Sequence, residues 1–134
     1  MESPEKKRGF SLLDQAKTLE ELSGAKVEID PGVFEKHSYV IQFNFNGAEV
    51  GVVASLDTSK RELLINGITV DEETAERGKG LGAKTVQALI SLARQNNLSV
   101  FATKVFAVAQ GFWERQGFVR CAEPNPNNTF EYRE

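Results

Sequence analysis

One glycine-rich hexapeptide has residue types and spacing that could do chemistry: Arg77-Gly78-Lys79-Gly80-Leu81-Gly82. It stands between a strand-like run, residues 63–70, and a helical run, residues 81–96. The first N–H groups of a helix have no partner within the helix, and the helix dipole adds about half a positive charge there. A glycine-rich loop that opens a helix can therefore hold a phosphate group with bare backbone.

Two nucleotide-binding patterns come close to this loop. A P-loop requires Ser or Thr after Gly-Lys to bind Mg²⁺, and a glycine follows Lys79 instead, so we reject this pattern. The dinucleotide pattern G-x-G-x-x-A is satisfied by Gly78, Gly80 and Ala83. However, the polar stretch 71–76 separates the strand from the glycines, where a dinucleotide fold has a tight turn. Nicotinamide binding therefore stays a distant alternative.

The composition is typical of one compact domain. The chain has 134 residues, of which 40% are hydrophobic, and a net charge of -3. This length lies near the common size of a domain, so we expect a single domain over residues 1–134. Residues 1–9 are charged and are expected to form a loose terminus. The acidic balance does not indicate a nucleic-acid partner and is compatible with a cationic substrate such as an amine.

Cysteine content and hydropathy favour a cytoplasmic protein. Cys121 is the single cysteine, so no internal disulfide can form. The first residues lack an apolar stretch of signal-peptide length, and no run approaches the ~18 apolar residues that span a bilayer. We expect no membrane partner. The one histidine, His37, gives no metal site, and no other residues have the spacing of metal ligands.

Hydrophobic periodicity predicts a mixed α/β chain. The predicted elements are, in chain order, a helix over 11–22, strands over 26–30, 37–45, 48–56 and 63–70, a helix over 81–96, a strand over 98–105, a helix over 106–116, and strands over 118–121 and 129–133. Asn46-Gly47 is the two-residue turn of a β-hairpin. The strand, helix and strand from residue 63 to 105 form a unit whose two strands are parallel.

From about residue 39 to its end, the chain resembles the GNAT superfamily of acyl-CoA-dependent N-acyltransferases. The family's central motif is Arg or Gln, two residues, Gly, one residue, Gly or Ala, and residues 77–82 are similar to it. The preceding strand resembles residues 64–70, and the acidic connection resembles Asp71-Glu72-Glu73. Residues 109–118 resemble the second hallmark, a helix that ends in aromatic, acidic, basic, any residue, Gly-Phe.

This resemblance implies a fold and a reaction. The fold is GNAT-like α/β, with a mixed, mostly antiparallel sheet, flanking helices and a splayed pair of parallel strands. The reaction is direct transfer of an acetyl group from acetyl-CoA to a primary amine, on a protein or a small molecule, by a monomer or homodimer. The residues implied to bind coenzyme A are Ile68, Val70, Arg77, Gly78, Lys79, Gly80, Leu81 and Gly82.

Backbone groups carry most of this implied site. Amides of residues 78–82 would bind the pyrophosphate, while Arg77 and Lys79 add positive charge. The pantetheine arm would lie along the strand edge at residues 68–70. The Val70 amide is then the candidate that polarises the thioester carbonyl.

Two positions depart from the family's pattern. By register with Gly117-Phe118, Trp113 stands where the family often has the tyrosine that protonates the leaving thiolate, and Phe106 stands where it often has an asparagine. An indole N–H donates hydrogen bonds but does not supply a proton at neutral pH. The alternative function is therefore a non-catalytic acyl-CoA-binding sensor or interaction module.

Other candidates for proton transfer are interpreted first as structural residues. For the acid they are Tyr39, Tyr132 and Cys121, and for the base Glu72, Glu73, Glu76 and His37. The aromatic residues Phe112, Trp113 and Phe118 are interpreted as core residues rather than as the lining of an acyl pocket.

Overall fold

The structure is a computed structural model that describes residues 10–32, 37–70 and 80–133. Its elements are, in order, the 3-10 turn η1 (Leu12–Asp14), α2 (Ala16–Ser23), β1 (Lys26–Pro31), β2 (Ser38–Phe45), β3 (Ala48–Asp57), β4 (Glu62–Val70), α3 (Leu81–Gln95), β5 (Ser99–Ala102), the 3-10 turn η2 (Ala107–Ala109), α4 (Gln110–Arg115), β6 (Phe118–Arg120) and β7 (Phe130–Tyr132).

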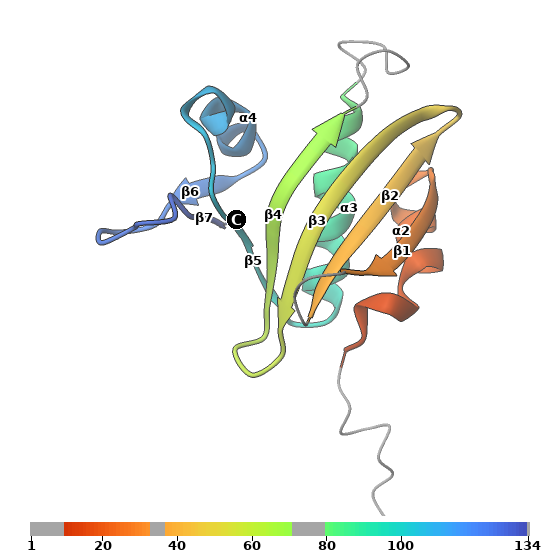
Figure 1. Cartoon of the computed structure of the whole chain (residues 1–134), viewed down its shortest axis with the longest axis horizontal. Helices are drawn as coiled ribbons and strands as arrows, with labels where there is room; N and C mark the ends of the chain where they lie inside the picture. The colour runs from red at the N-terminus through yellow and green to blue at the C-terminus, as the bar shows by residue number, and fades with distance from the viewer. Residues whose placement is uncertain (1–9, 33–36, 71–79, 134) are drawn as a thin grey trace, which may run out of the picture.

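Within these ranges the strands form one sheet in the order β1-β2-β3-β4-β5-β7-β6 (Figure 1). The neighbours β4 and β5 are parallel, and every other neighbouring pair is antiparallel. The predicted mixed, mostly antiparallel sheet with one parallel pair is therefore confirmed. None of the described helices is long and apolar enough to cross a membrane.

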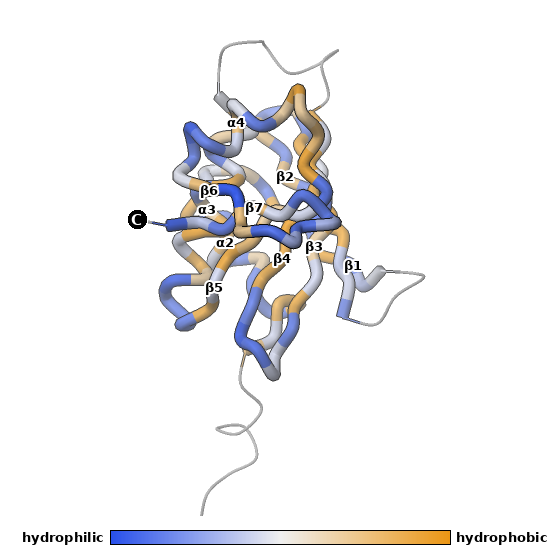
Figure 2. The backbone as a smooth tube through the Cα atoms, turned by 90° about the vertical axis from the view of Figure 1, so that its left-hand side faces the viewer, coloured by the Kyte–Doolittle hydropathy of each residue, from blue (hydrophilic) through white to orange (hydrophobic). Residues whose placement is uncertain are grey.

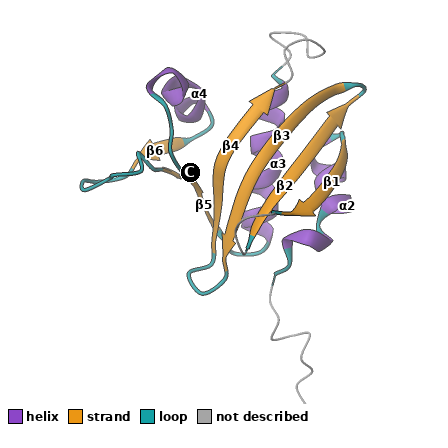
Figure 3. Ribbon diagram, in the orientation of Figure 1, coloured by secondary structure: helices purple, strands orange, loops and turns teal. Residues whose placement is uncertain are grey.

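The core lies between the sheet and the helices α2 and α3, which cover the same face of the sheet (Figures 1 and 3). Along β3, alternate residues from Ala48 to Leu56 are buried, whereas Val53 on the opposite face is 43% exposed. Leu89 and Leu92 of α3 are completely buried against this layer. Hydrophobic residues accordingly concentrate in the strands and α3, and hydrophilic residues in the turns (Figure 2).

The predicted hairpin is present between β2 and β3. Asn46 and Gly47 have φ angles of 57° and 101°, as a type I′ turn requires at both central positions. The Asn44 side-chain oxygen accepts a hydrogen bond from the Gly47 N–H at 2.6 Å. This turn fixes the register in which Phe45 lies opposite Ala48.

The strand predicted over 98–105 ends earlier, at Ala102. Lys104 has a left-handed backbone with a φ of 56°, which is incompatible with a strand. The N–H groups of Lys104 and Val105 donate to the carbonyl groups of Asn127 and Asn128, not to β4. Residues 104 and 105 therefore leave the sheet and contact the loop that precedes β7.

Two predicted helices are broken near their first turns. The helix predicted over 11–22 consists of η1 and α2, separated by Gln15, and Gly24 ends it with a φ of 81°. The helix predicted over 106–116 begins with η2, in which the Ala109 N–H donates to the Phe106 carbonyl at 2.9 Å. Apolar spacing over one turn does not distinguish a 3-10 turn from an α-helix, so the pattern predicted one continuous helix in each case.

Candidate active site

The strands β4 and β5 separate after four residue pairs. Their register runs from Glu62 opposite Ser99 to Ile65 opposite Ala102. The Thr103 N–H then donates to the Ile65 carbonyl at 3.0 Å, and the following chain moves away toward α4 (Figure 1). Since β4 continues to Val70, its last residues pair with no described strand on the side where β5 has left, and we call this opening in the sheet the gap.

The register of β3 indicates which amides of β4 face this gap. The Leu56 N–H donates at 3.0 Å to the carbonyl of His37, which directly precedes β2. Because backbone groups alternate in direction along a strand, Val52 and Val50 also direct their N–H groups toward β2. Their partners in β4 are Ile68 and Val70. These two residues form non-hydrogen-bonded pairs with β3, so their N–H groups point into the gap.

A β-bulge at Asn66 produces this orientation. Two consecutive residues of β3 lie opposite Ile65 and Gly67, so Asn66 is an extra residue in β4. Without the bulge, the backbone groups of every second residue after Ile65 would face the gap, and the Gly67 N–H would be the first of them. The bulge shifts the alternation by one residue, and Ile68 and Val70 face the gap instead. The strand predicted over 63–70 did not include this bulge, although Asn-Gly inside a strand is its signal.

The first turn of α3 lies at the open end of the gap. Gly80 is exposed, has a φ of 70° and precedes the helix, and no side chain among the described residues caps this end. A Cβ atom on Gly82 would lie 3.5 Å from the Phe112 ring and 3.6 Å from the Val70 side chain. Gly82 therefore marks the place where β4, α3 and α4 meet.

The structure thus places the described part of the predicted coenzyme A site around one gap. Ile68 and Val70 border it, and residues 80–82 lie at its open end. Arg77, Gly78 and Lys79 lie outside the described residues, as do Glu72, Glu73 and Glu76. Uncapped helix N–H groups, beside strand amides that have no partner among the described residues, can bind a phosphate group followed by an amide-containing chain.

The profile of the acetyltransferase (GNAT) family matches residues 8–118. The chain belongs to this family. No curated protein sequence matches it significantly. For this GNAT protein, the gap between β4 and β5 is therefore the candidate active site.

Three solved structures are similar to this GNAT protein in fold. Tetrahymena GCN5 has a TM-score of 0.59 at 15% identity, over 74% of this chain and 69% of that chain. RimL, a ribosomal alpha-N-protein acetyltransferase, has a TM-score of 0.56 at 15% identity, over 73% and 61%. Nourseothricin acetyltransferase has a TM-score of 0.54 at 19% identity, over 91% and 94%. At such identities the likeness shows the fold alone.

Trp113, at the family's usual tyrosine position, belongs to the core of this GNAT protein. Its side chain is only 4% exposed. Its ring makes edge contacts with Phe112 and Phe118, at centroid distances of 5.2 and 5.0 Å. Phe106, at the usual asparagine position, is 75% exposed. The interpretation of Trp113 and Phe118 as core residues agrees with their burial.

The three other candidates for the acid lie apart from the gap. Tyr39 is on β2, which β3 separates from β4, and Tyr132 is on β7, which β5 separates from β4. The Tyr132 ring packs against Phe118, at a centroid distance of 5.7 Å. Cys121 follows β6, and its N–H donates to the Thr129 carbonyl at 3.0 Å. These contacts are those of structural residues.

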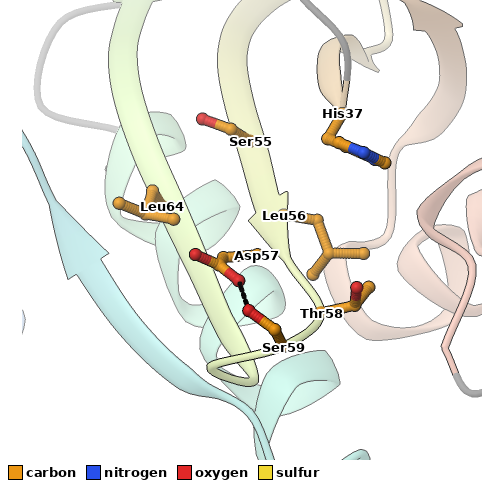
Figure 4. Close-up of a pocket in the computed structure, with 7 residues that line it drawn as sticks. All are labelled: His37, Ser55, Leu56, Asp57, Thr58, Ser59 and Leu64. Carbon is orange, nitrogen blue, oxygen red and sulfur yellow. Dashed lines mark hydrogen bonds between the residues drawn. The ribbon is translucent and has the colours of Figure 1, made fainter.

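His37 lines a hollow at the opposite end of the sheet (Figure 4). The residues around it are His37, Ser55, Leu56, Asp57, Thr58, Ser59 and Leu64. The Ser59 hydroxyl donates to Asp57 at 2.8 Å and the Lys60 N–H donates to it at 3.1 Å, and these bonds lower the pKa of Asp57. The His37 ring lies away from the Asp57–Ser59 pair in Figure 4. The two polar residues stabilise the β3–β4 turn rather than form a catalytic group.

We expect the Cys121 thiol to react slowly with iodoacetamide at about pH 7.5. Partial burial raises the pKa of the thiol, and the negative charge of Glu131 raises it further. A thiol with a raised pKa holds less of the reactive thiolate at neutral pH than an ordinary cysteine, whose pKa is about 8.5. The measurement is the alkylation rate against pH, with the urea-denatured chain as control. Equal rates in the folded and denatured chains would contradict this expectation.

Proposed function

We propose that this protein transfers the acetyl group of acetyl-CoA to a primary amine. The supporting observation is the gap itself: strand amides of Ile68 and Val70 face it, and the uncapped start of α3 lies at its open end. The same arrangement supports acetyl-CoA as the co-substrate, because its pyrophosphate and its pantetheine amides match these two kinds of group.

The position of each donor suggests which part of acetyl-CoA it contacts. The pyrophosphate would bind the first N–H groups of α3, and the pantetheine arm would run along β4 toward the point where the strands part. Val70 contacts the Gly82 position, whereas Ile68 lies two residues, about 6.6 Å, nearer that point. The sequence pointed to Val70 as the donor to the thioester carbonyl. The distance from the helix favours Ile68 for that contact and leaves Val70 to the pantetheine.

The reaction requires positioning and electrostatic stabilisation. The amine nitrogen attacks the carbonyl carbon, a C–N bond forms, and the C–S bond then breaks to release the thiolate of coenzyme A. The amine loses one proton to a base or to water, and the thiolate takes up one proton. The Ile68 N–H would stabilise the negative charge on the carbonyl oxygen. In other enzymes, loss of one such donor lowers kcat by about 10²–10³.

The acceptor is proposed only as a primary amine, on a protein or a small molecule. The net charge of -3 favours a cationic acceptor. One structural neighbour is named as an alpha-N-protein acetyltransferase and another as a nourseothricin acetyltransferase. These two names do not favour either a protein or a small molecule as the acceptor. We also propose that residues 1–134 form one domain, and that the protein is a cytoplasmic monomer or homodimer that binds neither nucleic acid nor membranes.

One observation favours a second function. Trp113 is buried in the core, and neither described tyrosine lies on a strand next to β4, so no tyrosine in the described part of the chain occupies the usual place of the acid. A protein of this kind could bind acyl-CoA without efficient turnover and act as a sensor or interaction module.

Thiol release from acetyl-CoA distinguishes the two functions. The protein is mixed with acetyl-CoA and a panel of amines that includes lysine-containing peptides, peptides with free N-termini, polyamines and aminoglycosides. We expect release that depends on one class of amine and exceeds the release without amine. Saturable binding without amine-dependent release would support the sensor, and absence of both would contradict both functions.

A further inference from the structure

Asn66 makes two side-chain hydrogen bonds at the point where β4 and β5 part. Its amide nitrogen donates to the Ser55 hydroxyl of β3 at 2.5 Å. Its amide oxygen accepts from the Thr103 hydroxyl at 2.7 Å. Ser55 and Thr103 lie on opposite sides of β4, so the Asn66 side chain connects three adjacent segments of the sheet.

These bonds lie at the last place where the two strands are joined. The Thr103 N–H donates to the Ile65 carbonyl, and the next N–H groups turn to the loop before β7. The apex of the gap, where β4 and β5 part, is therefore held by two kinds of hydrogen bond. One is the backbone bond from Thr103 to Ile65, and the others are the side-chain bonds of Asn66.

Asn66 is also the extra residue that determines which amides of β4 face the gap. A bulged residue is unpaired on its strand, so its position depends on what its side chain contacts. With both ends of its amide group bonded, the Asn66 side chain restrains the bulge in one conformation. Ile68, two residues further along, takes its direction from that bulge.

We propose that Asn66 is a positioning residue for acyl transfer. Through Ser55 and Thr103 it fixes the bulge and the apex of the gap, and so aims the Ile68 N–H at the thioester carbonyl. This inference rests on the proposed function. It assigns Asn66 an effect on the acyl end of the substrate, because the start of α3, where the pyrophosphate would bind, is at the other end of the gap.

Four variants test this role. Asn66→Leu removes both hydrogen bonds, and Thr103→Val removes one hydroxyl at nearly constant shape. Thr103→Ser keeps that hydroxyl and should therefore lack the loss of activity expected for Thr103→Val. The matched control is Ser23→Ala on α2, because the Ser23 hydroxyl also makes two bonds, donating to the Leu19 carbonyl at 2.7 Å and accepting from the Ala25 N–H at 3.1 Å.

We expect Asn66→Leu to lower kcat about tenfold or more, because small misplacements of reacting groups cost up to about 10²-fold. Its Kd for free coenzyme A should stay within about twofold of the parent value, since that ligand lacks the acyl end. Thr103→Val should lower kcat by less, and Thr103→Ser and Ser23→Ala should keep the parent value. An unchanged kcat in Asn66→Leu, or an equal loss in Ser23→Ala, would overturn the proposal.

Amide hydrogen exchange of the ligand-free protein separates failure of this inference from failure of the proposed function. The Gly67 and Thr69 amides face β3 and depend on the bulge for their alignment. We expect their exchange to accelerate at least about tenfold in Asn66→Leu and to stay unchanged in Ser23→Ala. If the parent protein has no transferase activity, this result still supports the role of Asn66 in the gap. Unchanged exchange would overturn it.

Discussion

Gly80→Glu is expected to weaken acetyl-CoA binding at least about a hundredfold, which corresponds to about 2.7 kcal/mol. Gly80 directly precedes α3, where the proposed pyrophosphate would sit, and a carboxylate there would repel the phosphate charges. A Cβ at this position meets no atom of the described residues within 4 Å, so this part of the fold has room for the new side chain. Isothermal titration calorimetry of parent and variant measures the change.

Gly24→Glu is the matched control for this variant. Gly24 also has a left-handed backbone, with a φ of 81° against 70° for Gly80, and none of the described atoms lies within 4 Å of its Cβ position. Both substitutions therefore add one negative charge and about 1–2 kcal/mol of backbone strain. Gly24 ends α2, away from the gap, so Gly24→Glu should lower the melting temperature but keep the affinity. Equal weakening in both variants would contradict the assignment of the phosphate site.

Trp113→Ala is expected to lower the free energy of unfolding by about 3–5 kcal/mol. The buried ring contacts Phe112 and Phe118, and its removal leaves a cavity between α4 and β6. Phe106→Ala is the control, because a ring that is 75% exposed contributes little burial. Urea denaturation followed by circular dichroism compares the two variants. A similar loss in both would contradict the core role of Trp113.

The same position decides whether a missing acid limits catalysis. Because the Trp113 side chain is buried in the aromatic cluster, we expect Trp113→Tyr to lower stability and not to raise turnover. Higher turnover in Trp113→Tyr would show instead that the chain is an enzyme that has lost its acid. The steady-state kcat for thiol release, measured with saturating acetyl-CoA and amine, distinguishes these outcomes.

Local signals in the sequence predicted the sheet well. Asn46-Gly47 requires positive φ angles, and the structure has them, so the hairpin and its register followed from two residues. The helix at residues 81–95 followed from a long apolar stripe, and its start after the glycines led to the prediction of a phosphate site there. The order of strand, helix and strand from residue 63 to 105 predicted that the two strands are parallel, as β4 and β5 are.

Long-range contacts explain what the sequence did not predict. The strand β5 ends early because Asn127 and Asn128, more than 20 residues further along the chain, accept its next N–H groups. The bulge in β4 depends on Ser55 and Thr103, which approach Asn66 only in the folded sheet. Such bonds leave no periodic pattern in the sequence, and the strand was predicted over 63–70 without an irregularity at Asn66-Gly67.

Titration of acetyl-CoA into the purified protein by calorimetry tests the central claim most directly. The gap between β4 and β5 is proposed to bind acetyl-CoA through the start of α3 and the strand amides of Ile68 and Val70. We predict saturable binding at one site per chain, with a Kd in the micromolar range. The absence of saturable binding by the folded protein would contradict both the transferase and the sensor function.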